Sequence, residues 1–323
     1  MKNSRKILSL ALSIVLLLAL PLSLFGCKTK PVIGVIQFGT HESLNNCYEG
    51  ILEGLKAGGV NLDDYDVRCL NSNFDVDSAA AQATSLVNAG AKVILGIATP
   101  TAVAAANASD GKLPVVYCAV TDDAIMKNYS AICGSSDRPN YVKTLELVTS
   151  VMGRGDLKIG VISHTSEDSD AVMISDLKEA AKAYAGMEID VRYLSDVTTI
   201  GTLTASMISS DQVDCFLNLL DNTVVGQLTN ILAVTDEAKI PVFGSEIEQV
   251  KAGCIAASSI DYNEVGAIAG GMAAKILAGT SADSLGCKVV SEPTAYYSSA
   301  VCEKLGIAAP ADPSVIAVES LGK

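Results

Sequence analysis

Short apolar runs alternate along this chain with segments whose apolar residues recur every third or fourth position. The runs at 32–38, 92–98 and 114–120 have the length and continuity of buried strands. The segment after the first run carries apolar residues at 44, 47, 48, 51, 52 and 55, which is the spacing of one helical stripe. Strands that alternate with helices predict βαβ units and parallel sheets, so we expect an α/β fold.

The strand series repeats in the second half of the chain. Three segments recur in the same order at a nearly constant spacing: IGVI at 33–36 and 159–162, DVR at 66–68 and 190–192, and the third strands at 92–98 and 213–220. This self-similarity predicts two lobes with the same βαβ order. We expect residues 32–136 and 254–285 to form lobe 1 and residues 137–253 and 286–323 to form lobe 2. The chain would then cross between the lobes near 136–140, 246–253 and 286–294.

The N-terminus has a different pattern. Three basic residues among the first six precede the apolar run 7–20, and together they have the form of an export signal. The tetrapeptide LFGC at 24–27 resembles the cleavage box of bacterial lipoproteins, although Phe25 is bulkier than usual there. We therefore expect residues 1–26 to be a signal peptide, Cys27 to carry a lipid and residues 27–31 to be a tether. A single transmembrane anchor is the alternative, because the apolar stretch is nearly long enough to span a bilayer.

Charge and length narrow the possible partners. The formal net charge is −13, and removal of the three N-terminal cations would make the exported chain more acidic. An acidic surface repels polyanions, so nucleic acids are not expected as partners. A body of roughly 300 residues suits two domains better than one.

The spacing of the cysteines and histidines in this sequence does not indicate a catalytic or metal-binding site. The eight cysteines after Cys27 form no CxxC pair and no Cys/His cluster, so no metal site is expected. Most lie in apolar strand runs, where we expect unpaired buried thiols, with Cys287 and Cys302 as the possible exception. The nucleotide-binding and hydrolase motifs GxGxxG, GxxxxGK[ST], GxSxG and HExxH are missing, so neither an enzyme nor a cofactor is expected. An exported enzyme that uses His41 and His164 across the cleft is an alternative.

Polar residues gather where the predicted strands end, which is where open α/β sheets bind ligands. Thr99 is expected as a helix N-cap with Pro100 at the first helical position, a place that favours a carboxylate. Asp221, Asp122 or Glu246 can hold an ammonium group, so the combination suits a zwitterion. The alternative for Thr99, Asp221 and Asn222 is that they only cap helices.

Six segments resemble one family when they are taken in order: IGVIQFGTHESLN, VILGIATPTAVAAANA, VVYCAVTDD, ICGSSD, LNLLDNTVVG and PVFGSE. They are similar to the substrate-binding lipoproteins of ABC transporters, in the tryptophan- and tyrosine-binding group, which have the type I periplasmic-binding-protein fold. The resemblance covers the chain after Cys27. It implies two Rossmann-like lobes, joined by three crossovers, that close on an amino acid in the cleft between them.

The resemblance also implies roles for particular residues. Thr99 and Thr121 would contact the carboxylate of the ligand. The α-amino end would be held from the other lobe by Asp221, Asn222 and Thr223. The cleft would also be lined by Gln37, His41 and Ser136. This sequence departs from the family pattern at the cleft, in Glu42 after His41, in Leu220 and in the loop 163–167. The candidate aromatic platforms are Phe38, Tyr117, Phe243 and Tyr262, each of which fits the core equally well.

These inferences together predict a binding protein. We expect a monomeric, lipid-anchored component of an ABC importer on the outer face of the bacterial cytoplasmic membrane. It would capture an aromatic amino acid, tryptophan or tyrosine, and deliver it to permease and ATPase subunits. The alternative is a ligand sensor of the same fold that presents its closed form to a signalling receptor.

Overall fold

The structure is a computed structural model that describes residues 29–165, 170–290 and 292–319. The described residues from Val32 onward form one compact unit. The predicted signal peptide and the lipid site at Cys27 lie outside the described residues. Among the helices that are described, none combines the length and the apolar character needed to cross a membrane.

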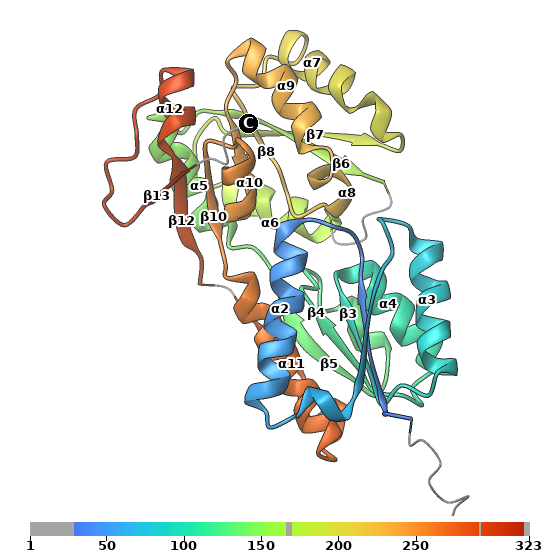
Figure 1. The fold of residues 1–323 in the computed structure, drawn as a ribbon. Coiled ribbons are helices and arrows are strands. Elements are labelled where there is room, and N and C mark those ends of the chain that lie inside the picture. Colours follow the sequence, from blue (N-terminus) through green and yellow to red (C-terminus); the bar gives the residue numbers. More distant parts are fainter. Residues whose placement is uncertain (1–28, 166–169, 291, 320–323) are drawn as a thin grey trace, which may run out of the picture. The chain divides into compact units, whose positions relative to one another are not determined.

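The first sheet is entirely parallel (Figure 1). Its order is β11-β5-β4-β3-β1-β2, with bounds β1 Val32–Gln37, β2 Asp66–Asn71, β3 Val93–Ile97, β4 Val115–Cys118, β5 Ile132–Ser136 and β11 Cys287–Val289. One face is covered by α2 (Glu42–Ala57) and α11 (Tyr262–Leu277), the other by α3 (Val76–Asn88) and α4 (Thr99–Ser109). The strands are buried on both sides, which explains their continuous apolar runs.

The second sheet repeats this plan with one antiparallel pair. Its order is β13-β12-β10-β9-β8-β6-β7, in which β12 runs antiparallel to β10. The strands are β6 Lys158–His164, β7 Glu188–Leu194, β8 Cys215–Leu217, β9 Val242–Gly244, β10 Ala256–Ser259, β12 Thr294–Ser298 and β13 Ile316–Val318. The helices are α5 Tyr141–Met152, α6 Asp170–Ala181, α7 Ile200–Ser209, α8 Asn222–Val225, α9 Leu228–Ala238, α10 Ile247–Ala252 and α12 Ser299–Leu305. Single 3₁₀ turns lie at Leu62–Asp64, Ile125–Asn128, Val197–Thr199 and Ala282–Ser284. The predicted α/β class with two lobes of the same βαβ order is confirmed.

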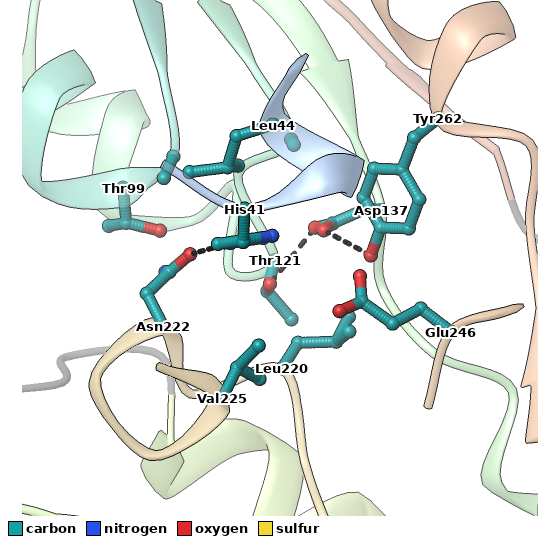
Figure 2. Close-up of a pocket in the computed structure, with 12 residues that line it drawn as sticks. His41, Leu44, Thr99, Thr121, Asp137, Leu220, Asn222, Val225, Glu246 and Tyr262 are labelled. Atoms are coloured by element: carbon teal, nitrogen blue, oxygen red, sulfur yellow. Dashed lines mark hydrogen bonds between the residues drawn. The ribbon is translucent and has the colours of Figure 1, made fainter. Parts of the chain in front are cut away.

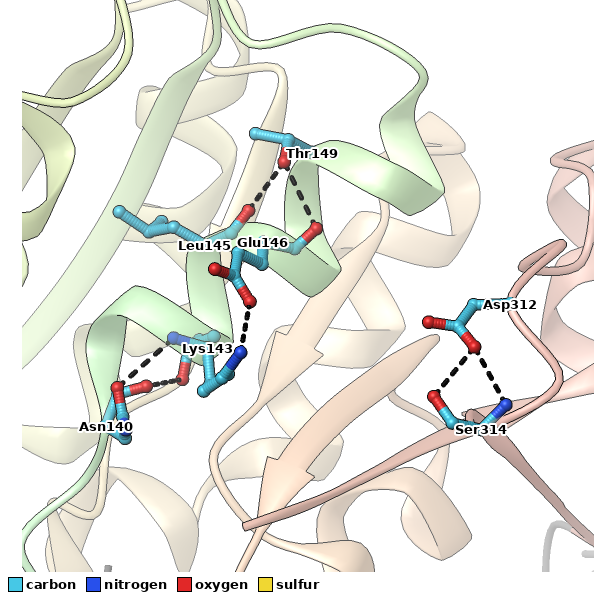
Figure 3. Close-up of polar contacts among 8 residues, drawn as sticks. Asn140, Lys143, Leu145, Glu146, Thr149, Asp312 and Ser314 are labelled. Atoms are coloured by element: carbon cyan, nitrogen blue, oxygen red, sulfur yellow. Dashed lines mark hydrogen bonds and ion pairs between the residues drawn. The ribbon is translucent and has the colours of Figure 1, made fainter. Parts of the chain in front are cut away.

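Where it is described, the chain crosses between the lobes three times, but two of the expected lobe boundaries are wrong. The first crossing follows β5 at 137–140, inside the expected segment 136–140, and ends at Asn140, whose side-chain oxygen accepts from the backbone N–H of Lys143 at the start of α5 (Figure 3). The second follows β10 instead of lying at 246–253, because β10 pairs with β9 and β12 and so belongs to the second lobe. The third follows β11 and lies within the predicted segment 286–294, but β11 pairs with β5 in the first sheet and not, as expected, with lobe 2. The sequence of a short apolar run does not indicate which sheet the strand will join, because strand pairing depends on contacts between residues far apart in sequence.

Helices α2 and α11 pack closely in parallel, with glycines at their interface. A Cβ added at Gly54 would lie 2.1 Å from the backbone oxygen of Ala267, and one at Gly270 would lie 2.2 Å from that of Ile51. Only glycine permits this approach between the two backbones. Because the helices are parallel, both begin at the carboxyl ends of the strands. His41, the N-cap of α2, and Tyr262, the first residue of α11, are therefore brought to the same end of the first lobe.

All eight cysteines of the described ranges are free thiols, and six of them are buried. Cys287 lies on β11 in the first sheet and Cys302 on α12 in the second lobe. Burial raises the pKa of Cys133 to about 12, so this thiol stays protonated and packs as an apolar group.

Candidate functional site

A cavity lies where the strands of both sheets end, and residues from both lobes line it (Figure 2). Its walls combine polar side chains with small and branched apolar ones: His41, Leu44, Ala98, Thr99, Ala119, Thr121, Asp137, Leu220, Asn222, Val225, Glu246 and Tyr262. Five of the nine predicted site residues are among them: His41, Thr99, Thr121, Asn222 and Glu246. No lysine or arginine lines this cavity within the described residues.

Thr99 lies where β3 turns directly into α4. The N-cap of α4 is Ala98, not Thr99 as the sequence predicted, because the chain turns at Ala98 with a positive φ of 78°. That backbone conformation is costly for a residue with a side chain, and such strain is concentrated at ligand sites. Thr99 and Pro100 then form the first turn of α4, whose free backbone N–H groups and positive dipole end favour an anion.

Two buried carboxylates occupy another part of the wall. The Thr121 hydroxyl donates to Asp137 Oδ1 at 2.9 Å, and the Tyr262 hydroxyl donates to Asp137 Oδ2 at 3.2 Å. Glu246 is 2% exposed, and its Oε1 accepts a hydrogen bond from Gln249 at 3.2 Å. Figure 2 shows the Glu246 carboxylate directed toward the Tyr262 hydroxyl. Two acids side by side in a cavity without a basic neighbour favour a cationic group of a ligand.

The environment of Asp137 changes its acidity. Burial raises the pKa of Asp137 to about 6, and the nearby charge of Glu246 acts in the same direction. The hydrogen bonds from Thr121 and Tyr262 oppose the increase, because they stabilise the ionised carboxylate. Burial also raises the pKa of Tyr262 well above its usual value, so its hydroxyl remains a donor.

The two lobes meet across the cavity at His41 and Asn222. His41 Nε2 lies 3.3 Å from Asn222 Oδ1, which is on the first residue of α8. The imidazole ring lies parallel to the Phe74 ring, with 6.4 Å between ring centroids and 5° between planes. The contact between His41 and Asn222 therefore joins the N-cap of α2 in the first lobe to the first residue of α8 in the second.

A family model described as "ABC transporter substrate binding protein" matches residues 32–320. The chain belongs to this family. The "Tyrosine-binding protein" of Clostridioides difficile (strain R20291) is 29% identical to it over 273 residues, which cover 82% of this chain and 78% of that protein.

Two solved structures support the same assignment. An ABC domain from Streptococcus pneumonia in complex with L-Trp is 27% identical, with a TM-score of 0.81 over 88% of this chain and 97% of that one. A conserved domain protein from Vibrio cholerae is 26% identical, with the same TM-score and the same coverage. The predicted family and its type I periplasmic-binding-protein fold are confirmed. The family consists of extracytoplasmic solute-binding proteins, so this substrate-binding protein is not an enzyme.

Four of the predicted site residues of this substrate-binding protein do not line the cavity: Gln37, Ser136, Asp221 and Thr223. Asp221 is fully buried and caps α8: its Oδ1 accepts from the backbone N–H groups of Thr223 and Val224 at 2.9 and 3.0 Å, and its Oδ2 accepts from that of His164 at 2.6 Å. Within the described residues, Thr223 contributes to this cap through its backbone N–H. For Asp221, the geometry matches the helix-cap alternative.

The other two stabilise the first lobe from behind the cavity. Gln37 Nε2 donates to Gly39 O at 2.7 Å and to Asn45 Oδ1 at 2.9 Å, which holds the loop after β1. Ser136 is buried, and its hydroxyl donates to Thr121 O at 3.4 Å. Gln37 and Ser136 therefore hold the residues around the cavity in place, and neither is part of the cavity surface.

Asp137 lines the cavity but is not among the predicted site residues, although the polar residues at the end of β5 indicated its neighbourhood. Tyr262 was one of four candidate platforms and is the one that lines the cavity. The other three, Phe38, Tyr117 and Phe243, lie in the core. No local signal separates these aromatic residues, since what distinguishes Tyr262 is the pairing of α11 with α2.

Proposed function

We propose that this substrate-binding protein captures an aromatic amino acid, tryptophan or tyrosine, for an ABC importer. The observation that carries the proposal is the distribution of charge in the cavity. Asp137 and Glu246 provide buried negative charge, Thr99 opens a helix whose N-terminus favours an anion, and apolar side chains such as Leu44 and Leu220 complete the walls. An amino acid with an apolar side chain matches all three features.

In this proposal the ammonium group of the ligand binds Asp137 and Glu246. Its carboxylate binds the Thr99 hydroxyl and the first N–H groups of α4. The family relatives support an aromatic side chain, because one is named a tyrosine-binding protein and another was solved with L-Trp.

Uptake requires the lobes to move. The free volume of the cavity is about 20 Å³, which is roughly the space of one water molecule. An amino acid can therefore enter only when His41 and Asn222 separate, and the three crossovers are the segments that allow this hinge motion. Ligand contacts that come from both lobes then favour the closed state.

The remaining elements of the proposal concern the place of action. Cys27 would carry the lipid that holds the protein at the outer face of the cytoplasmic membrane, with residues 27–31 as the tether. The protein would act there as a monomer and deliver its ligand to permease and ATPase subunits. The family assignment supports the transporter context.

The test is isothermal titration calorimetry on the protein that begins after residue 27. L-Tryptophan, L-tyrosine and L-phenylalanine are titrated beside L-glutamate and L-lysine, and we expect heat only with aromatic amino acids. Asp137→Asn should weaken binding at least tenfold, because it removes a buried charge that faces the ammonium group. The matched control is Asp66→Asn, which alters a surface pair with Arg68 on β2 and should leave affinity unchanged. An absence of binding with every amino acid would refute the proposal.

A further inference from the structure

We propose that His41 Nδ1 selects ligands whose side chain carries an N–H or O–H donor. This inference rests on the proposed function and specifies its substrate class. Under this inference tryptophan and tyrosine bind tightly and phenylalanine binds poorly. The difference arises from the tautomer of the His41 imidazole.

We assign the tautomer of His41 from its contact with Asn222. An amide oxygen has lone pairs but no hydrogen, so it can only accept. Because Asn222 Oδ1 is the atom that lies 3.3 Å from His41 Nε2, the hydrogen of the neutral imidazole is on Nε2. Nδ1 then carries the lone pair and is an acceptor.

The accepting nitrogen has no protein partner. His41 Nδ1 is buried, and no residue of the described ranges donates a hydrogen bond to it. Figure 2 shows this nitrogen on the side of the ring that faces Asp137 and Tyr262, across the cavity. Two hydroxyls of the cavity wall, those of Thr121 and Tyr262, already donate to Asp137. A buried acceptor of this kind is rare in folded proteins and indicates a ligand donor.

The ring is held in this orientation before a ligand arrives. His41 is the extended N-cap of α2, and Phe74 lies parallel to its ring. Phe74 is itself held edge-on by Phe38, with 5.8 Å between ring centroids and 84° between planes. Gly39 makes room for it, because a Cβ there would lie 2.1 Å from the Phe74 ring. An acceptor that is fixed in advance discriminates between ligands better than a mobile one.

The ligand donor comes from its side chain. The ammonium group is taken by Asp137 and Glu246, whose negative charge binds it more strongly than a neutral nitrogen can. The indole N–H of tryptophan and the phenol O–H of tyrosine are the donors that remain. A ligand without such a donor leaves Nδ1 buried and unpaired, which we expect to reduce affinity about 10- to 100-fold.

The test compares ligand pairs that differ only in this donor. L-Tyrosine is compared with L-phenylalanine, and L-tryptophan with 3-(3-benzothienyl)-L-alanine, in which sulfur replaces the indole N–H. In the unaltered protein, the member with the donor should bind at least tenfold more tightly in at least one pair. His41→Asn keeps an acceptor near the position of Nδ1 and should preserve this ratio. His41→Gln keeps polar contact toward Asn222 but loses that acceptor, and its ratio should fall below threefold.

A spectroscopic measurement separates hydrogen bonding from a merely structural role. The chain has only two histidines, so their ¹⁵N signals are readily distinguished with His41→Asn. The free protein should show an unprotonated Nδ1 at His41, whose resonance shifts when L-tryptophan or L-tyrosine binds. Equal affinities within both pairs, or a proton on Nδ1 in the free protein, would overturn the inference while leaving the proposed function intact. If no aromatic amino acid binds, both fail together.

Discussion

Asp137 and Asp221 both follow strands and are both buried, yet their surroundings give them different tasks. The oxygens of Asp221 accept three backbone N–H groups and are fully used in capping α8 and holding His164. Those of Asp137 accept two side-chain hydroxyls and face the cavity beside Glu246. A carboxylate that is satisfied by the backbone stabilises the fold, whereas one that faces a second acid in a cavity is suited to a cationic ligand.

The raised pKa of Asp137 predicts that affinity depends on pH. Below about pH 6 this carboxyl is protonated in the ligand-free protein, and the bound ammonium group requires the ionised form. The affinity for L-tryptophan should therefore increase as pH rises from 5 to 7, by up to about tenfold for each pH unit below the pKa. Calorimetry near pH 6 in buffers of different ionisation enthalpy should detect protons released on binding.

The same shift affects the stability of the ligand-free protein in the opposite direction. A carboxyl whose pKa is raised by folding binds more protons in the folded than in the unfolded state, so its contribution to the free energy of unfolding falls as pH rises from about 4 to 6. In Asp137→Asn, both pH dependences should be reduced. An affinity in the unaltered protein that stays constant between pH 5 and 7 would contradict the assignment of Asp137 to the ammonium group.

At the scale of elements, the parallel pair α2 and α11 determines the geometry of the site. The two helices lie about two hundred residues apart in sequence, yet they place His41 and Tyr262 at the same end of the first sheet. Their close approach depends on backbone-to-backbone contact, with Gly266 against Cys47 O and Gly270 against Ile51 O. A change of spacing between the helices would therefore be transmitted to the cavity.

Two adjacent glycines of α11 provide a matched test. Gly270→Ala would place a Cβ 2.2 Å from the Ile51 oxygen and should lower the free energy of unfolding by about 1–3 kcal/mol. At Gly271 an added Cβ meets no atom within 4 Å, so Gly271→Ala should raise it by about 0.5–1 kcal/mol. Chemical denaturation measures both values. Equal effects of the two substitutions would show that the interface is not packed as described.

At the scale of the whole molecule, the chain divides at residue 32 into the binding body and the N-terminal segment that precedes it in sequence. Binding is a property of the body, because every residue that lines the cavity lies between His41 and Tyr262. Membrane retention is assigned by our proposal to Cys27. The two functions should therefore be separable by mutation.

Cys27→Ala provides that separation. In bacterial cells that express the full chain, the variant should leave the membrane fraction and lose lipid labelling, because it lacks the thiol to which the lipid would attach. Its ligand affinity should equal that of the unaltered protein. The matched control is Cys69→Ala, which removes an exposed thiol on β2 and should leave the protein in the membrane fraction. Retention of Cys27→Ala in the membrane would argue against the lipid anchor.

The sequence predicted the location of the cavity better than it predicted which residues line it. It placed ligand binding at the carboxyl ends of the strands, and His41, Thr99, Thr121, Asn222 and Glu246 are indeed there. It could not separate Asp221 from Asp137, because a helix cap and a residue that lines a cavity use the same residue types at the same strand ends. The difference depends on which N–H groups happen to lie within reach of each carboxylate.

The sequence by itself determined the α/β class and the edge of each sheet at which a ligand can bind, through the periodicity of its apolar residues, and the two repeated lobes, through the recurrence of three segments in the same order. These follow from local rules, since buried parallel strands and one-sided helices each leave their own spacing in the chain. The tertiary structure alone decided that β10 joins the second sheet and β11 the first, that α11 returns to pack on α2, and that His41 meets Asn222. Those outcomes depend on contacts between residues far apart in sequence, and the local pattern of apolar and polar residues does not predict such contacts.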